Sequence, residues 1–238
     1  MKHYKLNILL SMFVMSLFVG CVEQITQTEE EVTGSGQLRF IHCASSTGEL
    51  DLTYLDLSDN NFYLAEENVV YGYQYGYYDL KTGDRVFRLY QPSNNIGVSE
   101  GKVTVENGKK YTLLAIDLEA TLSDEMMALE DTLAVPDSGR TFIRFMHFGA
   151  DVADLRITNR ETGAEVAKLS WLEVSPYVNL NAGTYRFSIT DPNGQDTFLE
   201  VSPVTFLSGN TYSFILSGTL TDLTPVEFNV KVFTETSL

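Results

Sequence analysis

Two copies of one sequence unit make up most of this chain. The unit opens with Leu38-Arg39-Phe40-Ile41-His42, repeated as Ile143-Arg144-Phe145-Met146-His147, and continues with Leu80-Lys81-Thr82-Gly83, repeated as Leu180-Asn181-Ala182-Gly183. Further matches in the same order pair Asp51-Leu52 with Asp154-Leu155, Gly108 with Gly209, and Tyr111 with Tyr212. Matched residues lie about 100 positions apart, so the repeat is a whole domain that can bury its own core. The chain is therefore predicted to fold as two domains of one kind.

The residue pattern inside each copy predicts strands and almost no helix. Short runs rich in Val, Ile, Thr, Tyr and Phe alternate with turns that contain Gly or Asn. This pattern predicts an all-β protein built of antiparallel β-sandwiches. The predicted strands are residues 86–91, 102–105, 111–117, 185–190 and 212–217. The turns predicted as hairpins contain Gly83, Gly108, Gly163, Gly183 and Gly194.

A segment of different composition separates the two copies. The apolar spacing in residues 123–133 predicts one or two helical turns, and Pro136 begins a turn-rich stretch that closes the connection. The predicted layout is a first β-sandwich at 37–118, a linker at 119–140 and a second β-sandwich at 141–238.

The N-terminus has the pattern of a bacterial lipoprotein signal. Lys2 and Lys5 precede an apolar run at residues 6–19, and Gly20 then stands before Cys21. The run has about 14 residues, whereas a helix needs roughly 20 to cross a bilayer. Residues 1–20 are therefore predicted as a signal peptide, Cys21 as the lipidation site and residues 21–36 as a flexible tether. The alternative is an ordinary secretory signal whose cleavage site lies beside a cysteine.

If Cys21 carries lipid, its thiol is not available for a disulfide. Cys43 is the only other cysteine in the chain, and it is then predicted to be a small buried apolar residue.

The chain is strongly acidic, with a formal net charge of −16. Such a charge repels nucleic acid and anionic lipid headgroups, so no nucleic-acid partner is expected. Solubility of a tethered protein explains the charge as well as a cation-binding role does, and is preferred. Glu29-Glu30-Glu31, close behind Cys21, resembles the surface-export signals of lipoproteins in the Bacteroidetes. The chain is thus predicted to be an outer-membrane lipoprotein, and two orientations stay open: display on the cell surface or a location in the periplasm.

These motifs together resemble a known family. The chain resembles domain of unknown function 4397, which is common in lipoproteins of Bacteroidetes. The resemblance is carried by the opening Arg-x-x-His strand, the Asp-Leu strand, the Leu-x-x-Gly turn and the final Gly-x-x-Tyr strand. It extends to the joining segment Leu129-Glu130-Asp131-Thr132-Leu133-Ala134-Val135-Pro136. The resemblance implies two tandem immunoglobulin-like or transthyretin-like β-sandwich domains in the cell envelope and carries no established activity. The sequence departs from the family after each histidine, at Cys43-Ala44-Ser45-Ser46 and at Phe148-Gly149-Ala150-Asp151.

A tyrosine-rich run is the candidate ligand-binding face. On a strand, Tyr71, Tyr73, Tyr75 and Tyr77 would share one face because alternate side chains point the same way. In the second copy Trp171 stands at the position of Tyr71. A row of aromatic rings suits the apolar face of a sugar. The preferred alternative is that these rings belong to a sandwich core or to a contact between domains.

The remaining polar residues predict no catalytic or metal site. His42 and His147 occupy matching positions without a second ligand nearby, so each is predicted to be a buried imidazole bonded to a backbone carbonyl. Arg39 and Arg144 are expected to pair with Asp51 or Asp154. The loop that begins at Asp191 has a calcium-loop composition, but its glycine spacing favours a hairpin turn. No motif implies a cofactor.

The sequence therefore predicts a lipid-anchored envelope protein that acts as a non-enzymatic binding or structural interaction module. A glycan-binding surface lipoprotein is the alternative, with the tyrosine run as the binding face. A hydrolase is the third reading, and it would need carboxylates brought together from both domains.

The lipid anchor can be tested in cells that produce the chain. Labelled palmitate is expected to enter the wild-type protein and to be absent from Cys21→Ala, which should also remain unprocessed because the lipid-modified cysteine directs cleavage. Membrane retention and normal processing of Cys21→Ala would contradict lipidation.

Overall fold

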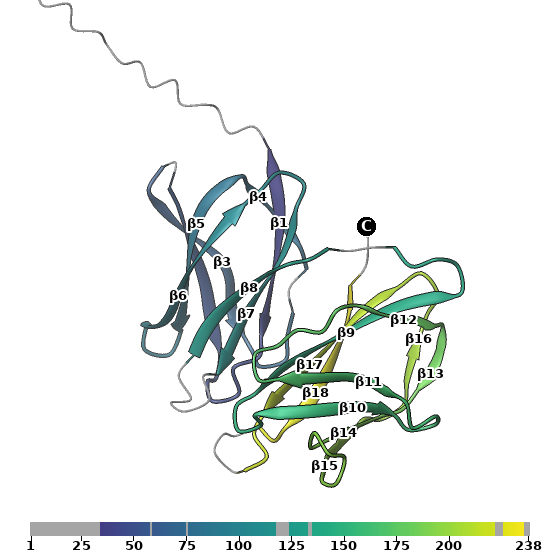
Figure 1. The fold of residues 1–238 in the computed structure, drawn as a ribbon. Coiled ribbons are helices and arrows are strands. Elements are labelled where there is room, and N and C mark those ends of the chain that lie inside the picture. Colours follow the sequence, from purple (N-terminus) through teal and green to yellow (C-terminus); the bar gives the residue numbers. More distant parts are fainter. Residues whose placement is uncertain are drawn as a thin grey trace, which may run out of the picture. The chain divides into compact units, whose positions relative to one another are not determined.

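The computed structural model describes residues 34–57, 59–74, 76–117, 124–132, 135–221 and 226–235. These residues form strands and their connections, with no helix among them (Figure 1). Nothing in this part of the chain could cross a membrane as a helix. The predicted lipidation site Cys21 and the ring of Tyr75 lie outside the described residues.

The first repeat is a sandwich of two four-stranded sheets, with strand orders β4-β1-β7-β8 and β3-β2-β5-β6. Apolar side chains on the inner faces, among them Phe40 and Phe87, meet in a continuous core. The strands of the first sheet are β1 (Ser35–His42), β4 (Tyr78–Lys81), β7 (Lys110–Asp117) and β8 (Asp124–Glu130). The strands of the second sheet are β2 (Leu50–Asp56), β3 (Asn61–Val69), β5 (Gly83–Gln91) and β6 (Ile96–Val105).

The second repeat has the same two four-stranded sheets, β12-β9-β17-β18 and β11-β10-β14-β15, with an additional pair β13-β16. Its core is rich in rings, and those of Phe145 and Phe214 have centroids 4.9 Å apart. The prediction of an all-β protein with two sandwich domains is confirmed. The strands are β9 (Arg140–Gly149), β10 (Asp154–Asn159), β11 (Glu165–Ser170), β12 (Val178–Asn181), β13 (Gly183–Tyr185), β14 (Phe187–Thr190), β15 (Thr197–Glu200), β16 (Val204–Phe206), β17 (Thr211–Gly218) and β18 (Asn229–Glu235).

Each repeat contains one parallel strand pair in addition to the predicted antiparallel pairs. β1 pairs in parallel with β7, and β9 pairs in parallel with β17. A parallel pair needs a long crossover rather than a short turn. Here the intervening strands of the opposite sheet supply that crossover, which local residue patterns do not reveal.

The glycine turns were correctly located, but only some of them are hairpins. Gly163 and Gly194 lie between paired strands, and their φ angles of 69° and 75° suit glycine. Gly83, Gly108 and Gly183 instead connect strands of different sheets, so the hairpin prediction is wrong for these three. Turn chemistry reverses the chain without deciding which strand the next segment will pair with.

The predicted helical turns at residues 123–133 are wrong, because β8 occupies most of this segment. β8 lies within the predicted linker and pairs antiparallel with β7. Met126 packs on the core of the first repeat, while Met127 and Leu129 pack on the opposite side. Both faces of the strand bury methionine or leucine, and the hydrogen bonds of the β7 edge override the weak helical spacing.

A third apolar cluster joins the two repeats, which belong to one compact unit. Leu38 and Phe40 face the first core, so the alternate residue Ile41 faces the other way, toward residues of the second repeat. Cys43 lies in this cluster as a free thiol, 2% exposed, which confirms its prediction as a buried apolar residue. The buried members of this inter-repeat cluster are Ile41, Cys43, Leu114, Ile116, Met146, Phe148, Ile215 and Phe233.

Candidate functional site

Within residues 71–74 and 76–77, the tyrosine-rich segment has a turn and one isolated bridge but no strand. Tyr71 and Gly72 form the turn, Gln74 makes a single bridge to Ile41, and β4 begins only at Tyr78. Strand alternation therefore does not place the tyrosine rings on one face.

The hydroxyl groups of two tyrosines contact polar side chains, one in the second repeat and one directly after β8. The Tyr71 hydroxyl lies 2.7 Å from Ser217 Oγ, and the Tyr77 hydroxyl donates to Asp131 at 2.7 Å. Burial raises the pKa of the Tyr77 hydroxyl well above its usual range. Tyr73 is 52% exposed, while Trp171 is half-buried. Ligand binding by this segment therefore stays a prediction.

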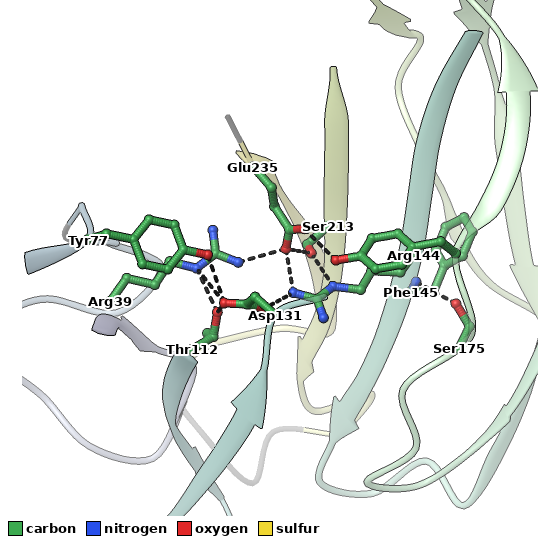
Figure 2. A network of polar contacts seen from close by, with 10 residues as sticks. Arg39, Tyr77, Thr112, Asp131, Arg144, Phe145, Ser175, Ser213 and Glu235 are labelled. Carbon is green, nitrogen blue, oxygen red and sulfur yellow. Dashed lines mark hydrogen bonds and ion pairs between the residues drawn. The ribbon is translucent and has the colours of Figure 1, made fainter. Parts of the chain in front are cut away.

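Two arginines and two carboxylates form a buried network between the repeats (Figure 2). Arg39 donates to Glu235 at 2.6 Å, and Arg144 donates both to Asp131 at 2.5 Å and to Glu235. Arg39 Nε also lies 3.9 Å from Asp131 Oδ2. The four side chains are at most 5% exposed. We call Arg39, Asp131, Arg144 and Glu235 the buried quartet; the expected partners Asp51 and Asp154 were wrong.

The two repeats supply corresponding polar groups to the buried quartet. In the first repeat, Arg39 donates to the Thr112 hydroxyl at 2.7 Å, and Thr112 donates to Asp131 at 2.5 Å. In the second, Arg144 donates to the Ser213 hydroxyl at 2.9 Å, and Ser213 donates to Glu235. The Tyr77 ring lies under Arg39, just as the Tyr177 ring lies under Arg144. The network is thus duplicated with the fold.

The buried quartet is electrically balanced, with two positive and two negative groups. Burial alone would raise the pKa of Glu235, but Arg144 and Arg39 together lower it below its ordinary value of 4.5. The carboxylates of Glu235 and Asp131 likewise raise the pKa of Arg144 against the effect of burial. Because the four side chains pair with one another and are at most 5% exposed, the network is closed to a ligand.

The histidines are structural, as predicted. His42 Nε2 lies 2.7 Å from the carbonyl of Gly48, and His147 Nε2 lies 2.8 Å from that of Val152. Both rings are fully buried. Burial lowers the pKa of His147 from 6.5 to about 4 and also lowers that of His42. Each neutral ring is thus held by a backbone carbonyl, and neither belongs to a group of three potential metal ligands among the described residues.

The loops where the sequence departs from its family are fixed by carboxylates. Asp117 accepts hydrogen bonds from the backbone N–H groups and hydroxyls of Ser45 and Ser46. In the second repeat, Asp151 accepts from Leu220 and Thr221. The first loop is thus tied to the end of β7 and the second to the segment that directly follows β17, and these polar groups are used internally.

The Asp191 loop is a hairpin turn, as predicted. The Asp191 carboxylate accepts backbone hydrogen bonds from Asn193, Gln195 and Asp196. Across the described ranges, no group of three or more His, Cys, Asp or Glu side chains has the arrangement of a metal site.

The outer face of the β3-β2-β5-β6 sheet exposes apolar side chains that sequence reasoning missed. Phe62 and Leu64 on β3 are 49% and 56% exposed. They lie opposite Leu55 and Thr53 of β2, whose side chains share that outer face. We call this surface the β3-β2-β5-β6 outer face. The sequence signal that could have revealed this face is the spacing of Phe62 and Leu64, which lie two positions apart and so point to the same side of an edge strand.

A hollow of about 250 Å³ lies on this outer face. Asp51 and Thr53 of β2 form its floor, Phe62 and Tyr90 stand on either side, and Asn95 of the β5–β6 loop completes it. Asp51 and Tyr90 lie directly opposite each other in the sheet. The hollow thus combines two rings with a carboxylate, a hydroxyl and a carboxamide.

The corresponding face of the second repeat is polar. In the first repeat, Leu64 lies opposite Thr53. In the second repeat, Glu165 lies opposite Thr158 and so corresponds to Leu64. In the same way, Tyr90 lies opposite Asp51 in the first repeat, and Thr190 lies opposite Arg156 at the corresponding place in the second. This register matches Asp51 with Arg156, so the sequence match of Asp51 with Asp154 was shifted by two residues. The two copies keep one fold but present different outer faces.

Family membership follows from the sequence match. The profile of a domain of unknown function, DUF4397, matches residues 36–158, more than half of the chain. The chain belongs to the DUF4397 family. The DUF4397 match runs from β1 into β10, and it confirms the family resemblance of the motifs. No curated protein matches the chain.

Solved structures resemble the chain only weakly. A leucine-rich repeat protein from Bacteroides thetaiotaomicron is 16% identical with a TM-score of 0.21, over 82% of this chain and 26% of that chain. CBMbc, a family CBM26 domain from Eubacterium rectale solved with maltoheptaose, is 9% identical with a TM-score of 0.27, over 84% and 98%. The tip fimbrial protein Mfa3 from Porphyromonas gingivalis is 10% identical with a TM-score of 0.22, over 84% and 98%. The DUF4397 chain spans about a quarter of the first of these proteins, and scores this low carry no functional argument.

Breaking the buried quartet should destabilise the protein. Arg144→Met leaves two carboxylates facing one arginine, and we expect it to lower the free energy of unfolding by about 3–5 kcal/mol. Adding Glu235→Gln removes one charge of each sign, so the double variant should be less destabilised than the two single variants summed. Chemical denaturation measures all four proteins, and simple additivity would contradict a shared network.

Stability should fall in mild acid because His147 is buried as a neutral ring. Its pKa is about 4 in the folded protein and 6.5 ordinarily, so its contribution is complete above pH 6.5 and is lost as the pH falls toward 4. The expected loss from His147 at pH 5 is roughly 2 kcal/mol. His147→Gln should unfold with a smaller difference between pH 7 and pH 5 than the wild type. An equal difference in both proteins would contradict this assignment.

Proposed function

We propose that this DUF4397 protein is a lipid-anchored component of the cell envelope that acts as a non-enzymatic binding module. The observation that carries the proposal is the asymmetry between the repeats. The first repeat exposes Phe62 and Leu64 on its outer face, where the corresponding strand of the second repeat presents Glu165 and Lys168. Exposed apolar side chains gathered on one sheet face favour a role in contacting a partner.

The proposed anchor lies at the N-terminus. Cys21 would carry the lipid, and residues 21–36 would tether the folded part to an outer membrane, facing either the periplasm or the exterior. Residues 37–118 and 141–238 would be two copies of the family's domain, joined through residues 119–140. The apolar run before Cys21 supports this arrangement.

A binding role is favoured over catalysis by the state of the buried polar groups. The quartet carboxylates are paired with arginines, and both histidines meet backbone carbonyls. General acid or base catalysis needs such groups within reach of a substrate. The groups that face the outer hollow suit recognition of a partner.

The binding face can be tested with the purified full chain on a solid support. Phe62→Ser with Leu64→Ser is expected to lose an envelope component of the producing cells that the wild type retains, since both changes remove exposed apolar contact. The matched control, Glu165→Ser with Lys168→Ser on the corresponding strand of the second repeat, should retain it. Equal retention by all three proteins, or retention by none, would contradict this face as the binding surface.

A further inference from the structure

We propose that the hollow between Phe62 and Tyr90 binds a neutral oligosaccharide. The inference rests on the proposed function, because it names the ligand of the same outer face. The tyrosine run was the earlier candidate for such a site, and the hollow lies on a different part of the first repeat.

The two rings are placed to hold the apolar face of a sugar. Phe62 keeps 49% of its surface exposed even though Arg88 lies over its ring at 4.5 Å. Arg88 is itself held by Glu100, so the position of the Phe62 ring is supported by two neighbours. Tyr90 stands on the other side of the hollow, and Gly97 leaves space beside its ring. The C–H face of a pyranose stacks on aromatic rings of this kind.

The floor of the hollow supplies hydrogen-bonding groups that are not all used within the protein. Asp51 accepts one backbone hydrogen bond, from Asn68 to Oδ1 at 2.8 Å, and no described residue donates a hydrogen bond to its Oδ2. Thr53 Oγ1 is buried and has no hydrogen-bond partner among the described residues. A buried hydroxyl without a partner is unfavourable, and rotation of the Thr53 side chain toward the hollow would let a ligand hydroxyl satisfy it. Asn95 adds a carboxamide at the rim.

The charge around the hollow selects against acidic ligands. Asp51 lies inside it, and Arg88, which lies over the Phe62 ring, is already paired with Glu100. The whole chain carries a net charge of −16. A phosphate, a uronic acid or a sialic acid would bring a second negative charge close to Asp51 without a cation to pair with it, and this repulsion costs binding free energy. A neutral sugar offers hydroxyls that both donate and accept.

The ligand is longer than one sugar ring. A second hollow of about 330 Å³, lined by Arg88 and Gly97 among others, shares Tyr90 with the first. A chain stacked on Phe62 can therefore continue past Tyr90 along the sheet. In the second repeat Thr190 and Glu165 stand where Tyr90 and Leu64 stand in the first, so only one site per chain is expected.

Calorimetric titration of the purified full chain tests this inference, in a detergent that has no sugar headgroup. The probes are cellohexaose, maltohexaose and mannohexaose, with hexagalacturonic acid as an acidic ligand of equal length. At least one neutral hexasaccharide should bind, and the acidic one should not. Phe62→Ala and Tyr90→Ala should each weaken binding about tenfold, which corresponds to about 1.4 kcal/mol.

The controls separate this site from the tyrosine run and from misfolding. Tyr73→Ala removes an exposed ring outside the hollow and should leave binding unchanged. Thr53→Val keeps the shape of the side chain but removes its hydroxyl, and it should weaken binding. Phe62→Ala and Tyr73→Ala should unfold thermally as the wild type does, since both rings are half exposed, and thermal unfolding of Tyr90→Ala and Thr53→Val checks that these two variants fold.

Several outcomes would overturn the inference. It fails if no neutral hexasaccharide binds at millimolar concentration, if the acidic one binds instead, or if Phe62→Ala and Tyr90→Ala bind as the wild type does. If Phe62 and Leu64 are needed to retain an envelope component while no neutral sugar binds, the sugar site is contradicted and the binding face is still supported. If retention does not depend on those residues, the binding face falls as well.

Discussion

The structure depends on four charges that are buried where the two repeats meet. Each charged group of the buried quartet loses its water on folding, a loss of several kcal/mol that only close partners can offset. Arg39 and Arg144 find those partners across the interface, in Glu235 and Asp131 respectively. A sliding or rotated interface would leave at least one charge unpaired. The quartet therefore selects one packing of the repeats, while the surrounding apolar cluster supplies most of the favourable burial.

This arrangement uses both faces of the central sheets. In β1, alternate residues face the sandwich core and the other repeat, so that Phe40 packs inside the sandwich while Arg39 and Ile41 face outward. The matching sheet of the second repeat does the same. The β4-β1-β7-β8 sheet is therefore largely buried, and its partner sheet, β3-β2-β5-β6, carries the outer face of the first repeat. Duplication of the fold has left one outer face in each repeat, and these two faces have diverged.

The divergence follows from what each position contributes to folding. Core residues such as Leu52 and Ile157 occupy corresponding places opposite Leu89 and Ile189, and both copies keep them aliphatic. Outer positions do not fill a core, so changes there alter stability little. Replacing one outer face with charged pairs, as at Arg156 and Glu165, leaves it soluble. Keeping Phe62 and Leu64 exposed on the other face brings no folding gain, which is why that face is the better candidate for binding.

The sequence by itself determined the repeat, the all-β class, the buried histidines and the free buried Cys43, because strand alternation and turn glycines act locally. It did not determine that residues 124–130 form a strand, since that depends on their edge pairing with β7 and not on the apolar spacing within the segment. It also misplaced the partners of Arg39 and Arg144, because Glu235 reaches Arg39, and Asp131 reaches Arg144, only after the repeats pack. Likewise, Asp51, Thr53, Phe62, Tyr90 and Asn95 come from three strands and a loop. Only tertiary structure brings such residues together, because strand register and sheet order set distances that sequence spacing does not contain.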